Sequence, residues 1–135
     1  MSEALNLFSL ETQRSEAAQR RHPVDMVHLA KQTLGDSGLE AEILLMFSEI
    51  VKGYMGKLKK GGTEGEIIHH LHTIKGAAMG VGASSIAVLA KATEAEFRET
   101  RILREESVDD LAMAVEEASV FIAGLISDYT ASAEA

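Results

Sequence analysis

The chain has 135 residues, with 21 Asp and Glu against 13 Lys and Arg, a formal net charge of −8 and no cysteine. This length suits one domain with a substantial core, and the lack of cysteine excludes disulfides, zinc–thiolate sites and thiol nucleophiles. The negative charge repels phosphates, so we expect no general nucleic acid binding. Because no apolar run could cross a bilayer and residues 1–21 do not resemble a signal peptide, we expect a cytoplasmic protein without a membrane partner.

The pattern of apolar and turn residues predicts an all-α chain. Its single proline is Pro23, and its glycines lie mainly between periodic segments. We expect a short helix from about residue 23 to 34, with Pro23 in its first turn and Gly35 as its stop. Residues 1–22 are expected to form an N-terminal extension that is partly disordered.

A first long helix is predicted from about residue 38 to 59. Ser37 with Glu40 three residues later resembles a capping box, and Lys60-Gly61-Gly62 ends the helix. Its apolar stripe is expected to face the core and comprises Leu39, Ile43, Met46, Phe47, Ile50, Tyr54 and Leu58. The lysines near its end suit a helix C-terminus, although they leave open a local contact with phosphates; they are Lys57, Lys59 and Lys60.

A second long helix is predicted from about residue 64 to 79. Thr63 and Glu66 form its capping box, and the turn Gly80-Val81-Gly82 closes it. A third follows from about residue 85 to 100, with an inward stripe of Ile86, Leu89, Ala90, Thr93 and Phe97. Two acidic residues of this third helix are interpreted as solvated charges, namely Glu94 and Glu96.

The last long helix is predicted from about residue 108 to 129, after a cap at Ser107 and Asp110. Its inward stripe is Val108, Leu111, Val115, Ala118, Ile122, Leu125 and Tyr129. Short connections between long amphipathic helices favour antiparallel neighbours. We therefore expect an antiparallel up-down-up-down four-helix bundle with a short additional N-terminal helix. This domain is expected to span residues 23–130 as a monomer, followed by a frayed tail at 131–135.

The most informative stretch is His72-Thr73-Ile74-Lys75-Gly76 in the second long helix. At about 100° per residue, with His72 at 0°, Lys75 falls at about −60°, Gly76 falls at about +40°, and an apolar stripe is centred at roughly 220°. That stripe is Ile67, Leu71, Ile74 and Ala78. His72 therefore points away from the core. An imidazole is a nucleophile, and at its ordinary pKa of about 6.5 much of it is neutral at physiological pH. This face is suited to handling phosphate.

Other side chains of the same helix surround this histidine. The helical wheel puts Ile68 at about −40° and Met79 at about −20°. These two residues either form an exposed docking patch or pack against the short N-terminal helix. His69, at about +60°, either contacts a partner or lies at the boundary of the core. His70, at about 160°, is expected to be structural.

These features resemble a known family. His72-x-x-Lys75-Gly76, then Gly82-Ala83 and a helix with Leu89 and Glu94, are similar to the histidine-containing phosphotransfer (HPt) domains of multistep phosphorelays. More loosely, the resemblance extends over residues 24–129, where it depends upstream on Asp25, Gly35-Asp36, Leu44 and Phe47. It implies that His72 accepts a phosphoryl group from the aspartyl phosphate of one receiver domain and delivers it to another.

The resemblance also implies roles for neighbouring residues and for partners. Lys75 would stabilise phosphoryl charge, Gly76 would allow close approach of the partner, and Gly82 would support the turn. The receiver docking surface would include Ile68, His69 and Met79. The partners would be receiver domains of a hybrid sensor histidine kinase and of a response regulator, which would bring the magnesium ion, so the chain needs no cofactor of its own. Because it has no glycine-rich nucleotide loop, we expect a phosphocarrier and not an enzyme.

Two other functions remain open. Glu66-x-x-His69 with His72 offers metal ligands, but ferritin-like sites need two such helices, and Lys75 would repel a cation. A helical-bundle adaptor that docks receiver domains without transferring phosphate would keep the same surface. Replacement of His72 by Gln separates the adaptor from the relay, because it should silence a relay and leave an adaptor working.

Overall fold

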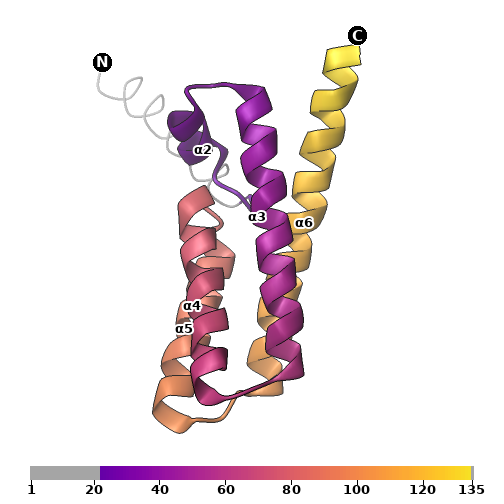
Figure 1. Ribbon diagram of the computed structural model, residues 1–135. Coiled ribbons are helices and arrows are strands. Elements are labelled where there is room, and N and C mark those ends of the chain that lie inside the picture. The colour runs from indigo at the N-terminus through magenta and orange to yellow at the C-terminus, as the bar shows by residue number, and fades with distance from the viewer. Residues whose placement is uncertain (1–21, 135) are drawn as a thin grey trace, which may run out of the picture.

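A computed structural model describes residues 22–134 of the chain, which are helical apart from their connections (Figure 1). The elements are α2 (Met26–Thr33), α3 (Ser37–Lys60), α4 (Glu64–Val81), α5 (Ser84–Thr100) and α6 (Glu105–Glu134). The prediction of an all-α chain is confirmed. The predicted N-terminal extension lies outside the described residues, except for His22, whose ring stacks on Phe121 of α6 at 5.5 Å between centroids.

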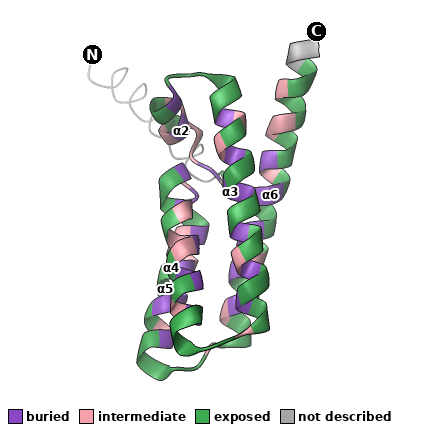
Figure 2. Cartoon of the chain, viewed as in Figure 1, coloured by how far each residue is buried: buried purple, intermediate pink, exposed green. Residues whose placement is uncertain are grey.

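The four long helices form an antiparallel bundle, as the sequence predicted. Helix α3 packs against α4 and α6, and α5 packs against the same two helices, so the four close a ring around one core (Figure 1). Helix α2 lies at the end of the bundle where α4 meets α5, and it contacts α3. Buried residues follow the inward faces of all four helices (Figure 2). None of the described helices is long and apolar enough to span a membrane.

Aspartates begin the first two helices, contrary to two sequence predictions. The Asp25 carboxylate accepts hydrogen bonds from the backbone N–H groups of Val27 and His28, so α2 begins after Pro23 and does not include it. The Asp36 carboxylate caps α3 by accepting from the N–H of Leu39 at 3.1 Å. Ser37 is therefore inside the helix and not its cap. An aspartate directly before a serine offers a second good cap, and sequence spacing alone did not distinguish the two.

The buried face of α3 differs from the predicted stripe. Its buried side chains are Glu40, Leu44, Phe47, Ser48, Val51, Met55 and Leu58. Leu39 is 41% exposed, Met46 is 60% exposed and Ile50 is 38% exposed, so the predicted stripe was wrong at these three positions. Apolar residues occupy two adjacent stripes of this helix, and polar contacts select between them. Glu40 accepts hydrogen bonds from the Thr33 hydroxyl at 3.2 Å and the Tyr129 hydroxyl at 3.0 Å, which turns the stripe containing Glu40 inward.

Helix α4 continues beyond the predicted end, through Gly80 to Val81. The predicted cap at Thr63 is present: its hydroxyl accepts from the N–H of Glu66 at 3.2 Å and donates to the Glu66 carboxylate at 3.1 Å. Gly82 ends the helix in the left-handed region with φ of 77°. A Cβ at this position would lie 3.0 Å from the Cβ of Asp25, and the Gly82 carbonyl accepts from the N–H of Asp25 at 3.0 Å. The contact between α2 and the end of α4 therefore needs glycine here.

Helix α6 is longer at both ends than the sequence predicted. It begins at Glu105, so Ser107 lies in its first turn and does not cap it. It also continues to Glu134, so residues 131–134 are helical and not the frayed tail that was expected. The predicted seam is largely buried, including Val108, Leu111 and Ile122.

Candidate functional site

The predicted histidine lies midway along α4 and points to solvent. Its side chain is 64% exposed. The predicted stripe of Ile67, Leu71, Ile74 and Ala78 is buried on the opposite side of the helix. The backbone of α4 thus presents an imidazole on a rigid helical surface, with both ring nitrogens available for chemistry or for contacts with neighbouring side chains.

A buried carboxylate lies beside the ring, on α5. Glu94 is only 8% exposed, so its interpretation as a solvated charge was wrong. Its Oε1 accepts a hydrogen bond from Lys75 Nζ at 3.0 Å, and its Oε2 accepts two from Arg98, at 3.1 Å and 3.0 Å. His72 Nδ1 lies 3.7 Å from Oε2, which is too long for a hydrogen bond but within the range of an ion pair. We call these four side chains the Glu94 cluster.

The charge of Glu94 is maintained by its two cationic partners. Burial alone would raise the pKa of this carboxyl group, but hydrogen bonds and Coulombic attraction from Lys75 and Arg98 outweigh burial and lower the pKa below its ordinary value. Glu94 is therefore ionised at neutral pH. The face of His72 that carries Nδ1 consequently meets a fixed negative charge, while Nε2 is left for an incoming group.

An aromatic cluster lies on the other flank of α4, toward α3. The Tyr54 ring approaches His69 edge-on at 5.9 Å and His70 at 5.6 Å between centroids, and Lys57 Nζ lies 4.7 Å from the centre of the Tyr54 ring. His69 is exposed, whereas His70 is buried. His70 thus belongs to the packing between the two helices, and His69 is on the surface one turn before His72.

A shallow apolar groove lies between α3 and α4 on this same flank. It has a volume of about 180 Å³ and is lined by Ile43, Met46, Phe47, Ile50, Ala77 and Val81. Gly76 precedes Ala77, is exposed, and has open space where a Cβ would project. The groove and the bare backbone at Gly76 leave this flank open to a partner surface. Met46 and Ile50 lie on this surface and not in the predicted core stripe, because a neighbouring apolar stripe of α3 is the buried one.

The two apolar residues predicted beside His72 differ in exposure. Met79 is 63% exposed and lines a separate hollow with Gly82 and Val88 at the end of α4. Ile68 is only half-exposed and packs against the core cluster. Met79 is therefore not buried against α2, and Ile68 offers a partner only part of its side chain.

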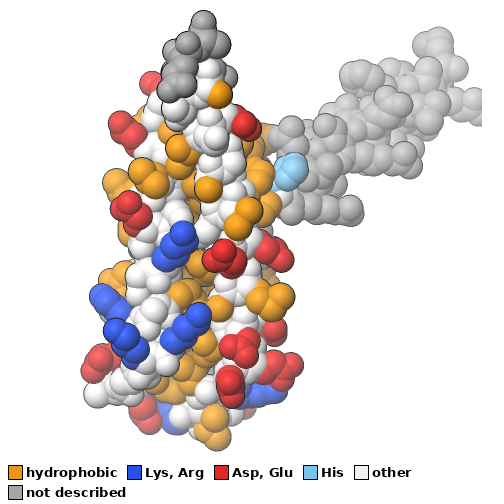
Figure 3. Space-filling view, turned by 90° about the vertical axis from the view of Figure 1, so that its right-hand side faces the viewer, with side chains coloured by type: hydrophobic (Ala, Val, Ile, Leu, Met, Phe, Trp, Pro, Cys, Tyr) orange, Lys and Arg blue, Asp and Glu red, His pale blue; other side chains and the backbone are white. Residues whose placement is uncertain are grey.

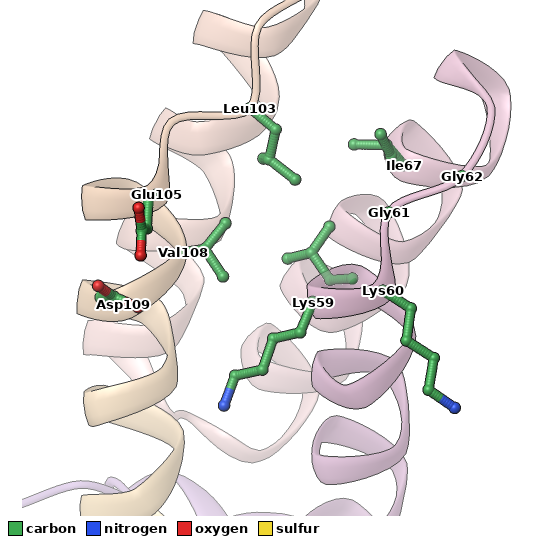
Figure 4. Close-up of a pocket in the computed structure, with 10 residues that line it drawn as sticks. Lys59, Lys60, Gly61, Gly62, Ile67, Leu103, Glu105, Val108 and Asp109 are labelled. Atoms are coloured by element: carbon green, nitrogen blue, oxygen red, sulfur yellow. The ribbon is translucent and has the colours of Figure 1, made fainter.

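The largest cavity is remote from this site. It opens at the end of the bundle opposite α2, has a volume of about 670 Å³, and has Ile67, Leu103 and Val108 along its apolar wall (Figure 4). Across it, Lys59 at the end of α3 extends toward the side of Glu105 and Asp109 at the start of α6, whereas Lys60 points away from them (Figure 4). It contains no histidine, so it contributes nothing to the chemistry of His72. Among residues 22–134, no three His, Asp or Glu side chains are grouped closely enough to hold a metal ion.

Comparison with known proteins gives one family. A family model described as Hpt domain matches residues 25–121, which is more than half of the chain and includes every residue of the Glu94 cluster. No curated protein and no solved structure matches the chain.

Proposed function

The chain belongs to the Hpt domain family, whose members are phosphocarrier modules of phosphorelays, and we propose that His72 is its phosphoacceptor. In this proposal His72 takes the phosphoryl group from the aspartyl phosphate of one receiver domain and passes it to the aspartate of another. The observation that carries the proposal is the exposed imidazole whose Nδ1 faces the buried carboxylate of Glu94 at 3.7 Å. The chain acts as a carrier and makes no phosphate bond from ATP.

The transfer step balances with the groups at hand. The lone pair of His72 Nε2 attacks phosphorus while the bond between phosphorus and the aspartyl oxygen breaks, and the aspartate leaves as a carboxylate. The proton on Nδ1 stays on the ring, which gains positive charge as the N–P bond forms. Glu94 is suited to compensate that charge, because its carboxylate is ionised and close to Nδ1. Transfer onward to the second receiver runs the same steps in reverse, with the aspartate of that receiver attacking phosphorus and His72 Nε2 leaving.

Lys75 has a more constrained role than sequence reasoning gave it. Its ammonium group donates to Glu94 at 3.0 Å, and 22% of the Lys75 side chain is exposed. We infer that Lys75 shares its hydrogen bonds between Glu94 and the phosphoryl oxygens once His72 is phosphorylated. An ammonium has three donors, so it does not need to release Glu94 to do so. Lys75 therefore tunes the rate of transfer and the lifetime of phosphohistidine, without being essential.

We propose that the receiver domain docks over the α3–α4 flank. The apolar groove that contains Met46 and Ile50 supports this choice, as does the bare backbone at Gly76. Exposed His69 and the accessible part of Ile68 extend the surface along α4, and Met79 continues it toward α5, where it lines the hollow with Val88. Magnesium comes with the acidic site of the receiver, where it stabilises the charge of the transferred phosphoryl group.

Phosphate acceptance can be tested by intact mass at neutral pH. The protein is incubated with several receiver domains carrying aspartyl phosphate, beside His72→Gln and the control His22→Gln, which changes an exposed histidine that lies against α6 and outside the docking surface. The proposal predicts one added phosphoryl group on the wild type and on His22→Gln, and none on His72→Gln. Absence of phosphate from the wild type with all receivers, while the receivers still bind, would favour the adaptor instead.

The docking surface has its own test. Met46→Asp places a charge in the groove, whereas Leu45→Asp places the same charge on the adjacent residue, which is also exposed but does not line the groove. We expect Met46→Asp to slow transfer from the receiver by about tenfold, a loss of about 1.4 kcal/mol in binding. Leu45→Asp should transfer like the wild type, and equal effects of the two variants would contradict this docking surface.

A further inference from the structure

Beside His72, on the α5 flank, three cationic side chains surround a small hollow. It has a volume of about 180 Å³ and is lined by Lys75, Lys91, Glu94, Ala95 and Arg98. Glu94 is the single carboxylate among these residues, and it is already bonded to Lys75 and Arg98. The hollow therefore carries excess positive charge in a chain whose net charge is −8.

Lys91 is the least satisfied of the three cations. It is exposed and forms no salt bridge with any residue in the described range 22–134, whereas Lys75 and Arg98 both pair with Glu94. Arg98 is also 54% exposed, so part of its guanidinium group remains open to a partner. A cation without an intramolecular partner on a negatively charged protein is available for intermolecular pairing.

The opposite side of the bundle gives a useful contrast. On the face on the α6 side, Lys and Arg side chains gather mainly over one half, and most Asp and Glu side chains lie over the other half and at the lower end (Figure 3). Lys59 lines the large cavity together with Glu105 and Asp109. None of the salt bridges within residues 22–134 includes Lys59, so shared lining with two carboxylates does not pair its charge. The hollow at Lys91 differs from that surface in its position next to His72.

We propose that this hollow is an electrostatic docking site for acidic side chains on the receiver domain, and that it selects receivers with an acidic rim. The inference rests on the proposed function and adds a partner chemistry to it. The apolar groove on the α3 flank and the basic hollow on the α5 flank lie on either side of His72. A matching receiver therefore has an apolar patch on one side of its aspartate and carboxylates on the other.

Charge pairs at the rim of an interface act mainly on the rate of association and depend on salt. The test therefore compares wild type, Lys91→Glu and the control Lys59→Glu, which changes net charge equally on the far side of the bundle. The rate of transfer is measured at low and high salt from receiver domains of differing acidity, each carrying aspartyl phosphate. Direct phosphorylation by phosphoramidate, a small donor that needs no docking, reports on the intact His72 site, and thermal unfolding reports on the fold.

We expect Lys91→Glu to slow transfer from acidic receivers by about three- to tenfold at low salt. At high salt the transfer rate of this variant should approach that of the wild type. Lys59→Glu should stay within about twofold of wild type, and all three proteins should react equally with phosphoramidate. If the wild type accepts phosphate and Lys91→Glu matches it at both salt concentrations, the docking inference fails while the proposed function stands. If Lys91→Glu also loses phosphoramidate labelling, Lys91 acts on the reaction and not on docking. If no receiver phosphorylates the wild type, both fail.

Discussion

Replacement of Glu94 by Gln removes a buried negative charge and leaves the shape of the side chain almost unchanged. In the wild type this carboxylate accepts three hydrogen bonds, from Lys75 and Arg98. Hydrogen bonds to charged groups contribute about 1.5–3 kcal/mol each when fully buried. Here both donors reach water, with 22% and 54% of their side chains exposed, so they recover much of their hydration. We expect a net loss of about 1–2 kcal/mol in the free energy of unfolding at neutral pH.

The dependence of this loss on pH has a definite sign. The folded protein holds the pKa of Glu94 below its ordinary value. The stabilisation from its charge is therefore complete at pH values above the ordinary pKa, and it disappears as the pH falls through the lowered pKa of the folded state. The difference between wild type and Glu94→Gln should be largest at neutral pH and shrink in acid.

Urea unfolding followed by helical circular dichroism at a series of pH values measures this difference. Glu96→Gln is the matched control on the same helix. Its partner Arg104 is 3.8 Å away, and 33% of the Glu96 side chain and 56% of the Arg104 side chain are exposed, so we expect a change below about 0.5 kcal/mol. Equal stability of wild type and Glu94→Gln at neutral pH would refute the reasoning. A difference that persists unchanged through the acid range would also refute it, because the loss would then arise from packing and not from charge.

Three further changes have expected outcomes. Gly82→Ala should lower the free energy of unfolding by about 1–3 kcal/mol in urea titration, because φ is 77° and the new Cβ would meet Asp25 at 3.0 Å; an unchanged stability would contradict the close contact with α2. Gly76→Gln should leave the free energy of unfolding unchanged or raise it by up to about 1 kcal/mol, since the new Cβ meets open space. The same variant should slow phosphoryl transfer from the receiver about tenfold. A transfer rate equal to that of the wild type would argue against close approach of the receiver at Gly76. Tyr129→Phe should lower the free energy of unfolding by about 1 kcal/mol. Burial and the Glu40 carboxylate raise the pKa of Tyr129, so this stabilisation is complete below the ordinary tyrosine pKa and is lost as the pH rises through the raised value. A difference between wild type and variant that did not shrink at alkaline pH would contradict the hydrogen bond.

The sequence predicted the helices well and their buried faces less well. The period of the apolar residues identifies the helices as amphipathic, and glycines mark where α3 and α4 end. Of the three predicted caps at Ser37, Thr63 and Ser107, only Thr63 caps its helix. Helix α3 shows where this information stops. Two neighbouring stripes are both apolar, and the choice between them depends on the contacts that Glu40 makes with Thr33 and Tyr129. Those contacts join three different helices, so no local pattern in the sequence contains them.

The candidate site was predicted in part for a similar reason. His72 and Lys75 lie within one turn of a single helix, so their spacing alone placed them together. Glu94 and Arg98 come from α5, and their approach to His72 depends on how α4 and α5 pack. One signal was available, because Glu94 lies one turn beyond Ala90 of the predicted inward stripe and four residues before Arg98. A carboxylate at that register is expected to be partly buried and paired.

The central claim is that the chain carries phosphate between two receiver domains. The most direct measurement mixes a radiolabelled phosphoreceiver with a second, unlabelled receiver and a catalytic amount of this protein, and follows the label on the second receiver with time. The proposal predicts that label reaches the second receiver only when the protein is present and that His72→Gln abolishes this arrival. Arrival of label at the same rate with His72→Gln, or with no added protein, would contradict the proposed relay.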